Sequence, residues 1–557
     1  MSAPSEALAA TTRGRRMLVR GRILDPVGER ADEAMLVEDG RVRALGSFDE
    51  LLRLAGEGIE VLDRRDAGDI VPGFVDAHTH LGSASRVLGL NVSVHTPPVS
   101  SIAEMLVVLR RAEPGLPEGE WLQAQGNLGQ SYRLEDRRYP TRHDLDAVSA
   151  TRPIIVRFGA HVWVFNTAGL ARLGIDRDTR LPEPVYIEHD AAGEPTGLIN
   201  DIVFAADAVP GELPPTSADD FRRAIVATTE RYFTARGVTT IGEIPDDVME
   251  IRVMREEQDA GRLPLRIALY TLGAQATALL DDWPRSASWF ADDPERWFVR
   301  GFKLAADGGI SAREAAVWND YVDRPGYRGQ LGLTPQQIGD IVDRAEQLGL
   351  QVMVHTAGDR AMDMVLDAFE AARPDDGVWR SRHRIEHLGN MFSTDERLRR
   401  CRDLGITPVA NIGFLHGIGD SMRGVVGDDF ASSPMYRLRA MLELGLPTVG
   451  ASDFAGGLPE ISDPVHLMRV MRERRTFSGV EVGPDQALTP WEALRAVTAH
   501  AAWSLQLEDE VGSLAPGHWA DFAVLSGDLV GADADRLGGD GVHVVETWLA
   551  GESVWRA

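Results

Sequence analysis

Apolar and polar positions along the chain follow two periods. Short apolar runs bounded by turn residues, the pattern of buried strands, occur at residues 75–80, 237–244, 264–272, 299–308, 350–358, 382–389, 405–413 and 446–453. Segments with apolar residues three and four positions apart, which indicate amphipathic helices, follow most of these runs, as at 334–349 and 489–505. Eight strands alternating with helices predict an α/β fold, a closed parallel (β/α)8 barrel of the TIM type.

Two parts of the chain depart from this alternation. Residues 83–219 separate the first strand from its expected helix, and a segment of this length is too long for a loop, so we expect an inserted subdomain over the active-site mouth. The ends, residues 16–70 and 507–557, carry short strand-like runs with turns, and we expect them to form one composite β-sandwich domain. The barrel is then expected over residues 71–506, and residues 1–15 as a disordered lead-in.

Composition and net charge limit the classes of molecule with which the protein can interact. A chain that is 44% hydrophobic and 26% charged is ordinary for a soluble globular protein, and a net charge of −27 disfavours nucleic acid or an acidic membrane as a partner. The single cysteine, Cys401, excludes an intrachain disulfide. No secretory signal is visible, and no run approaches the ~20 apolar residues needed to span a bilayer. We expect a cytoplasmic protein that acts on a small molecule, with a homodimer left open as its assembly.

Lysine occurs once in the chain, at Lys303. Lysine and arginine together number 58, so all the others are arginines. A lysine can lose its proton when it is desolvated, whereas an arginine cannot. The apolar residues on both sides of Lys303 indicate a buried strand that ends in the turn at residues 307–309. Our hypothesis is that carbon dioxide converts Lys303 to a carbamate whose two oxygens bridge two metal ions. The alternative is a surface residue without a function.

Six ionisable residues fall at the carboxyl ends of five predicted strands: His78, His80, Lys303, His355, His387 and Asp453. Barrel enzymes place their catalytic residues at that edge, and the two-residue period of a strand points His78 and His80 to the same face. Imidazoles and carboxylates are natural ligands of zinc and similar metals. A lone histidine is more often a hydrogen-bonded structural residue. We assign that role to His383 and to His95, His143, His189, His416, His466, His500, His518 and His543.

These residues lie within longer motifs. The chain resembles the metal-dependent amidohydrolase superfamily, and more narrowly the group of YtcJ-like proteins and N-substituted formamide deformylases (amidohydrolase 3). The resemblance runs from about Met17 to Trp555, and the matching stretches are VPGFVDAHTHLG at 71–82, the segment 139–175, GVTTIGEI, GFKLAADGG, VHTAGDRAMD at 354–363, HRIEHLG, GASDFA at 450–455 and VGSLAPGHWADFAVL at 511–525.

The resemblance implies a ligand set and a mechanism. One metal ion would be bound by His78, His80 and Asp453, and a second by His355 and His387, with N6-carboxylated Lys303 bridging both. It implies two divalent ions, with zinc expected and manganese or iron able to fit the same ligands. Catalysis would use a metal-bridging hydroxide with Asp453 as the proton shuttle.

The resemblance also concerns the substrate. It implies substrate contacts from His161, Asn166 and Arg313. The chain departs from the group pattern at two sites, and both departures put the substrate in doubt. Glu314 stands where threonine is usual, and Asn411-Ile412 stands where Gln-Pro is usual.

The function implied is hydrolysis of a non-peptide carbon–nitrogen bond, in a formamide, another amide or an N-acyl amine. Two alternatives stay open. One is an ester or lactone hydrolase that uses the same binuclear centre, and the other is a non-catalytic binding protein on the amidohydrolase fold. Because all six ligand positions are filled, the sequence speaks against the second alternative.

Overall fold

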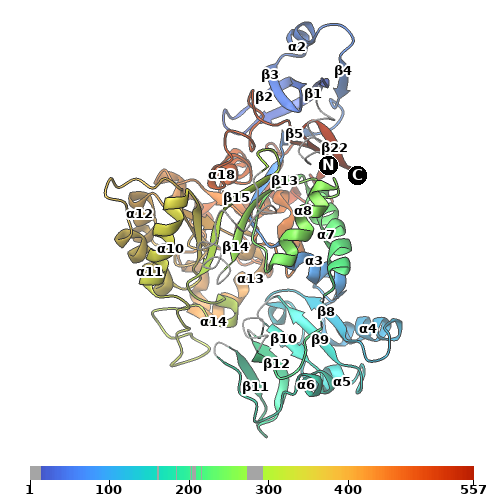
Figure 1. Cartoon of the computed structure of the whole chain (residues 1–557), viewed down its shortest axis with the longest axis vertical. Helices are drawn as coiled ribbons and strands as arrows, with labels where there is room; N and C mark the ends of the chain where they lie inside the picture. Colours follow the sequence, from blue (N-terminus) through green and yellow to red (C-terminus); the bar gives the residue numbers. More distant parts are fainter. Residues whose placement is uncertain are drawn as a thin grey trace.

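The structure is a computed structural model that describes residues 14–159, 162–182, 185–200, 202, 208–214, 216–272 and 293–557. Three sheets organise these residues. Figure 1 shows them arranged along the long axis of the molecule, with strands of the two chain ends at the top, a barrel in the middle and a third sheet at the bottom.

The middle sheet is the predicted parallel barrel. Its strands follow one another in chain order: β6 (Phe74–Thr79), β13 (Val238–Glu243), β14 (Arg266–Leu272), β15 (Trp297–Ala305), β16 (Gln351–His355), β17 (Arg384–Glu386), β18 (Thr407–Ala410) and β19 (Val449–Gly450). Each pair of neighbours is parallel. The first and last strands approach each other beyond the end of β19, where the amide of Asp453 donates to the carbonyl of His78 in β6 over 2.8 Å. The prediction of an α/β fold is confirmed, with eight parallel strands in a nearly closed barrel sheet.

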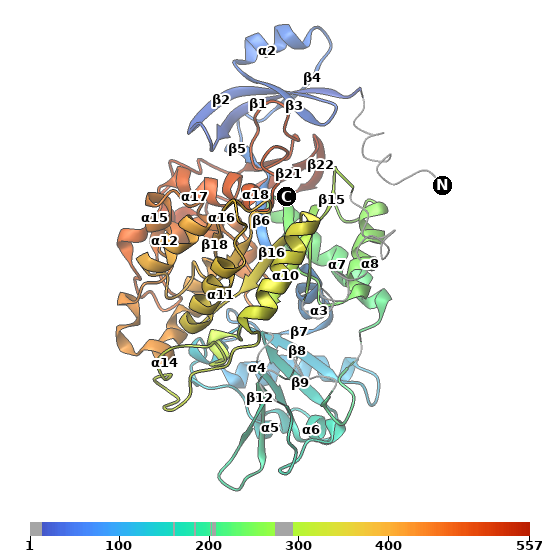
Figure 2. The same ribbon diagram turned by 60° about the vertical axis from the view of Figure 1, so that its left-hand side comes forward.

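Helices pack on the outside of the barrel (Figure 2). They include α7 (Ala218–Tyr232), α8 (Val248–Asp259), α10 (Pro335–Leu348), α11 (Asp359–Ala371), α12 (Asp395–Leu404), α15 (Leu438–Glu443), α16 (Pro464–Glu473), α17 (Pro490–Ala496) and α18 (Ala499–Ser504). Helix α10 shows how the sequence specifies them. Thr334 and Gln337 form a capping box at its start, and Gly349 ends it in the left-handed conformation. Its buried residues Ile338, Val342 and Ala345 are four and three positions apart, so one face meets the barrel.

The two ends of the chain share one eight-stranded sheet, which we call the terminal sheet. It contains β1 (Arg16–Asp25), β2 (Arg30–Glu38), β3 (Arg41–Gly46), β4 (Glu60–Asp63), β5 (Asp69–Pro72), β20 (Phe522–Leu525), β21 (Val544–Leu549) and β22 (Glu552–Arg556). The two halves join where β5 pairs antiparallel with β20, and α2 (Phe48–Ala55) packs against β2. The pairing gives one continuous sheet, and a sandwich stays a prediction. Residues 1–13 of the expected lead-in lie outside the described residues.

The third sheet lies in the segment between residues 92 and 200, which we call the insertion. Its strand order is β11-β12-β10-β9-β8-β7. The bounds are β7 (Val92–Ser93), β8 (Leu122–Gly126), β9 (Ile154–Phe158), β10 (Val162–Phe165), β11 (Tyr186–His189) and β12 (Pro195–Asn200), with α4 (Ile102–Ala112), α5 (Arg142–Asp146) and α6 (Thr167–Leu173) between them. Helix α3 (Leu81–Leu90) directly follows β6 and packs against α7. The expected boundaries at residues 83 and 219 therefore fall inside two neighbouring helices.

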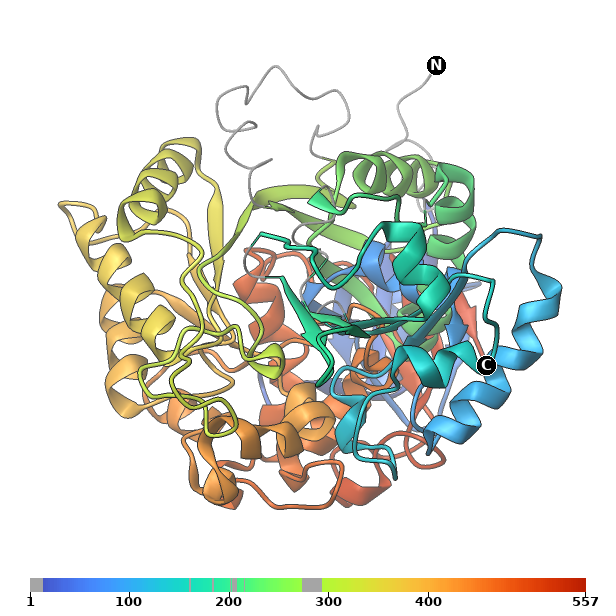
Figure 3. The same ribbon diagram turned by 90° about the horizontal axis from the view of Figure 1, so that it is seen from below.

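The insertion lies across one end of the barrel, as the view from below shows (Figure 3). Hydrogen bonds attach it to the loops at that end. The amide of Leu128 donates to the carbonyl of Gly457 over 2.9 Å, after the last barrel strand. A guanidinium nitrogen of Arg133 lies 2.8 Å from a carboxylate oxygen of Glu460. Within the described ranges, no helix has the length and apolar surface that crossing a bilayer requires.

Candidate metal centre

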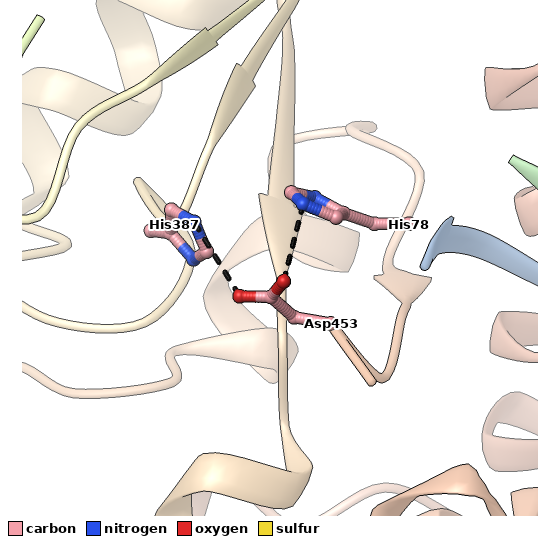
Figure 4. A group of neighbouring side chains, drawn as sticks. All are labelled: His78, His387 and Asp453. Atoms are coloured by element: carbon pink, nitrogen blue, oxygen red, sulfur yellow. Dashed lines mark ion pairs between the residues drawn. The ribbon is translucent and has the colours of Figure 1, made fainter. Parts of the chain in front are cut away.

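Asp453 stands at the centre of a group of histidines. It follows β19 with a φ of 55°, and its side chain points toward His78 and His387. Its Oδ1 lies 3.3 Å from Nε2 of His78 and 3.3 Å from Nε2 of His80. Its Oδ2 lies 3.7 Å from Nε2 of His387. Figure 4 shows His78 and His387 approaching the two carboxylate oxygens from opposite sides.

Lys303 lies beside the same histidines. Its Nζ is 3.0 Å from Nε2 of His78, and the residue is only 4% exposed. Burial lowers the pKa of the Lys303 amine to about 8. A larger fraction of the amine is therefore neutral at neutral pH than in an exposed lysine, and the neutral amine is the form that reacts with carbon dioxide.

The remaining ligand candidate is His355, at the end of β16. Its ring centroid lies 4.5 Å from that of His387, which follows β17 with a φ of 68°. Burial lowers the pKa of His387 to about 3, and burial together with the charge of Lys303 lowers the pKa of His78 to about 4. Both imidazoles are therefore neutral at physiological pH, which is the form that binds metals.

The donor set fits a divalent cation. Ligand atoms of His78, His387 and Asp453 all lie within 4.8 Å of one another, with both histidines buried and the aspartate half-buried. Imidazole and carboxylate donors at this spacing suit zinc-like metals. The structure brings all six predicted residues to one end of the barrel, because His80 and Lys303 adjoin this group directly and His355 adjoins it through His387. Their roles as ligands stay a prediction.

Sequence reasoning missed a buried carboxylate beneath the group. Oε2 of Glu386 lies 2.6 Å from Nδ1 of His78. Nε and Nη2 of Arg384 donate to the two oxygens of Glu386 over 2.8 and 3.0 Å. The signal was available in the motif HRIEHLG, because residues two apart on a strand face the same way and Arg384 and Glu386 lie on the predicted strand before His387.

Two further carboxylates hold the loops that carry the ligands. Glu243 accepts hydrogen bonds from the Leu81 amide over 2.7 Å and the Thr79 hydroxyl over 2.9 Å, so it fixes the chain on both sides of His80. Asp307 accepts from the amides of Ala357 and Gly358 over 2.9 and 2.8 Å, which ties the loop after β15 to the loop after β16. Burial raises the pKa of both carboxyls to about 7.

The predicted substrate residues lie elsewhere or outside the described part. His161 lies outside the described residues. Asn166 is fully buried, and its Oδ1 accepts from the amides of Ile154 and Gly169 over 2.9 and 2.8 Å, so that it caps α6. Arg313 pairs with Asp323 over 2.7 Å and donates to the hydroxyl of Tyr132 in the insertion over 3.3 Å. Contact of these three residues with a substrate stays a prediction.

Comparison with known proteins shows the family to which the chain belongs. A profile described as the amidohydrolase family matches residues 69–555. The chain belongs to the amidohydrolase family. The amidohydrolase is 28% identical over 528 residues to the N-substituted formamide deformylase of Arthrobacter pascens, covering 93% of this chain and 94% of that protein. It is also 28% identical over 519 residues to the putative amidohydrolase YtcJ of Bacillus subtilis, covering 91% and 93% of the two chains. The predicted resemblance is confirmed.

Solved structures share the fold of this amidohydrolase. The crystal structure of an uncharacterized metal-dependent hydrolase from Pyrococcus horikoshii superposes with a TM-score of 0.71 at 22% identity, covering 94% of this chain and all of that one. A second such hydrolase, from Pyrococcus furiosus, superposes with a TM-score of 0.69 at 24% identity, covering 92% of this chain. The likeness of fold therefore extends over more than nine-tenths of this chain.

Proposed function

We propose that this amidohydrolase hydrolyses a non-peptide carbon–nitrogen bond in a small amide, with N-substituted formamides as the first class to test. The observation that carries the proposal is the buried group of His78, His387, Asp453 and Lys303 at one end of the barrel. The choice of bond is supported by the similarity to the Arthrobacter pascens protein, which is named for deformylation of N-substituted formamides.

We assign two divalent metal ions to the site, with zinc expected. His78, His80 and Asp453 would hold one ion, and His355 and His387 the other. Lys303, as N6-carboxylysine, would stand between them, and its low exposure keeps competing water away from the carbamate. When bound, such ions lower the pKa of water and polarise a carbonyl oxygen.

Asp453 is the proton carrier of the proposed reaction. Burial favours its neutral form, but the neighbouring rings of His78, His80 and His387 hold its pKa well below the ordinary range, so the carboxylate is ionised. An ionised carboxylate can take a proton from the attacking water and pass it to the departing amine nitrogen. Protonating that nitrogen lets it leave as a neutral amine rather than as an amide anion.

Activity assays on the purified protein test this function. The panel pairs N-alkyl and N-aryl formamides with larger N-acyl amines and with esters and lactones of matched size. We expect release of formate and amine that stops when a chelator removes the metal and returns when zinc is added. A higher kcat/KM for esters or lactones would favour the ester-hydrolase alternative. A protein that binds no metal and turns over no member of the panel would be the non-catalytic binding protein.

A further inference from the structure

Three of the site histidines have a partner on the ring nitrogen that faces away from Asp453. Nδ1 of His80 lies 3.1 Å from the carbonyl oxygen of Ile244, and Nδ1 of His387 lies 3.2 Å from the side-chain nitrogen of Asn390. Nδ1 of His78 lies 2.6 Å from Oε2 of Glu386. Only the partner of His78 carries a charge, and that contact is the shortest of the three.

Glu386 is held in place by a second residue. Arg384 donates to both of its carboxylate oxygens and, through Nη2, to the carbonyl of Ala77 over 3.0 Å. Ala77 immediately precedes His78, so one guanidinium orients both the carboxylate and the backbone that carries the imidazole. Arg384, Glu386 and His78 are all fully buried, which excludes exchange of these contacts with bulk water.

We propose that Glu386, oriented by Arg384, is a positioning residue that holds His78 with its proton on Nδ1 and its Nε2 lone pair directed at the metal. This inference rests on the proposed metal centre. A neutral imidazole carries one N–H, and an ionised carboxylate only accepts hydrogen bonds. The proton must therefore sit on Nδ1, which leaves Nε2 free beside Asp453 and Lys303. The charge of the carboxylate also makes the ring a stronger ligand.

A glutamine at this position cannot replace the carboxylate. Glu386 receives three N–H groups on its two oxygens, two from Arg384 and one from His78. An amide has one oxygen and one nitrogen that only donates. Glu386→Gln therefore turns an N–H either toward Arg384, where it meets another donor, or toward His78, where it favours the ring form with its proton on Nε2.

The molecule contains a matched control for a purely structural role. Arg266 and Asp521 form another fully buried pair, with contacts of 2.6 and 3.0 Å, between the start of β14 and the terminal sheet. This pair lies at the end of the barrel away from the metal site and touches no site histidine. Asp521→Asn thus disturbs a buried arginine–carboxylate pair without changing the orientation of His78.

The test measures metal affinity by competition with a chromophoric chelator, for zinc binding to the parent, Glu386→Gln and Asp521→Asn proteins. We expect zinc to bind about 10- to 100-fold more weakly to Glu386→Gln and with unchanged affinity to Asp521→Asn. Melting of the metal-free proteins shows that each variant is folded. Unchanged zinc affinity in a folded Glu386→Gln protein, or an equal loss in Asp521→Asn, overturns the role of Glu386. A parent that binds no zinc instead rejects the metal centre itself.

If Glu386→Gln does not fold, a measurement on the parent protein tests the proposal. Its cobalt-loaded form should show a paramagnetically shifted ring N–H proton resonance that persists after transfer to deuterium oxide, because the His78 ring is fully buried. If every such resonance disappears immediately after transfer to deuterium oxide, Nδ1 of His78 carries no protected proton. That result would overturn the proposal.

Discussion

The amine of Lys303 lies 3.0 Å from Nε2 of His78, although β13 and β14 separate their strands in the barrel sheet. Two side chains on strands this far apart meet only if both point into the barrel near its axis. The one lysine of the chain therefore occupies the place where the proposed metal ions require a bridge.

Replacing this lysine by arginine tests the bridge. Lys303→Arg keeps a positive charge but cannot form a carbamate, because a guanidinium does not lose its proton. We expect a protein that is folded, as judged by circular dichroism, but that has lost its metal, as judged by elemental analysis, and its activity in the formamide assay. Arg300→Lys on the same strand is the control and should keep both. A fully active, metal-loaded Lys303→Arg protein would end the carbamate hypothesis.

Asp453→Asn tests the proton carrier. The residue has a φ of 55°, and asparagine tolerates this left-handed conformation, so the variant should fold. Loss of general acid–base catalysis should lower kcat by about 10²- to 10⁴-fold. Asp39→Asn is a matched control, since Asp39 is an exposed aspartate with a φ of 53°. Near-normal turnover by Asp453→Asn would assign the proton transfer to another group.

The buried pair of Arg266 and Asp521 joins the barrel to the terminal sheet. Asp521→Asn leaves Arg266 charged and without its carboxylate in the interior, which should lower the free energy of unfolding by about 3–5 kcal/mol. Urea denaturation measures the change. Asp403→Asn removes an exposed partner of Arg402 and should change the free energy of unfolding little. Equal small effects of the two substitutions would show that water reaches Arg266.

Glu346 makes stability depend on pH in the acid range. Burial opposes its ionisation, but the ring of His383 at 3.2 Å and the amides of Arg380 and Ser381 lower its pKa from 4.5 to about 2. A carboxyl with a depressed folded-state pKa stabilises fully above its unfolded value and loses this contribution as pH falls toward 2. The difference in unfolding free energy between the parent and Glu346→Gln should therefore be larger at pH 7 than at pH 3. A difference independent of pH would contradict this assignment.

The barrel was predictable because its signals are local. Each strand is a short apolar run, and the two-residue period that pairs His78 with His80 can be read from three consecutive positions. The roles of the carboxylates Glu243, Asp307 and Glu386 were not predicted, because each holds a group from a distant part of the chain: Leu81 is 162 positions from Glu243, Ala357 is 50 from Asp307, and His78 is 308 from Glu386. Only the closed barrel brings these groups together.

Asn166 shows a different limit. Its motif matches the family, and we expected a substrate contact from that match. Its side-chain oxygen caps the first turn of α6, and the sequence did carry that signal, because asparagine before an apolar helical segment is a common N-cap. The structure therefore gives Asn166 a backbone role that the motif alone did not name, and its contact with a substrate stays a prediction.

The terminal sheet has a consequence for synthesis on the ribosome. Strand β5 pairs with β1 on one side, but its other neighbour, β20, begins at Phe522. Until that residue is translated, the nascent chain carries an open strand edge next to the apolar residues Ile70 and Val71, a site for pairing with other chains. Chaperones that shield such edges should therefore associate with this protein until β20 has been synthesised and can pair with β5.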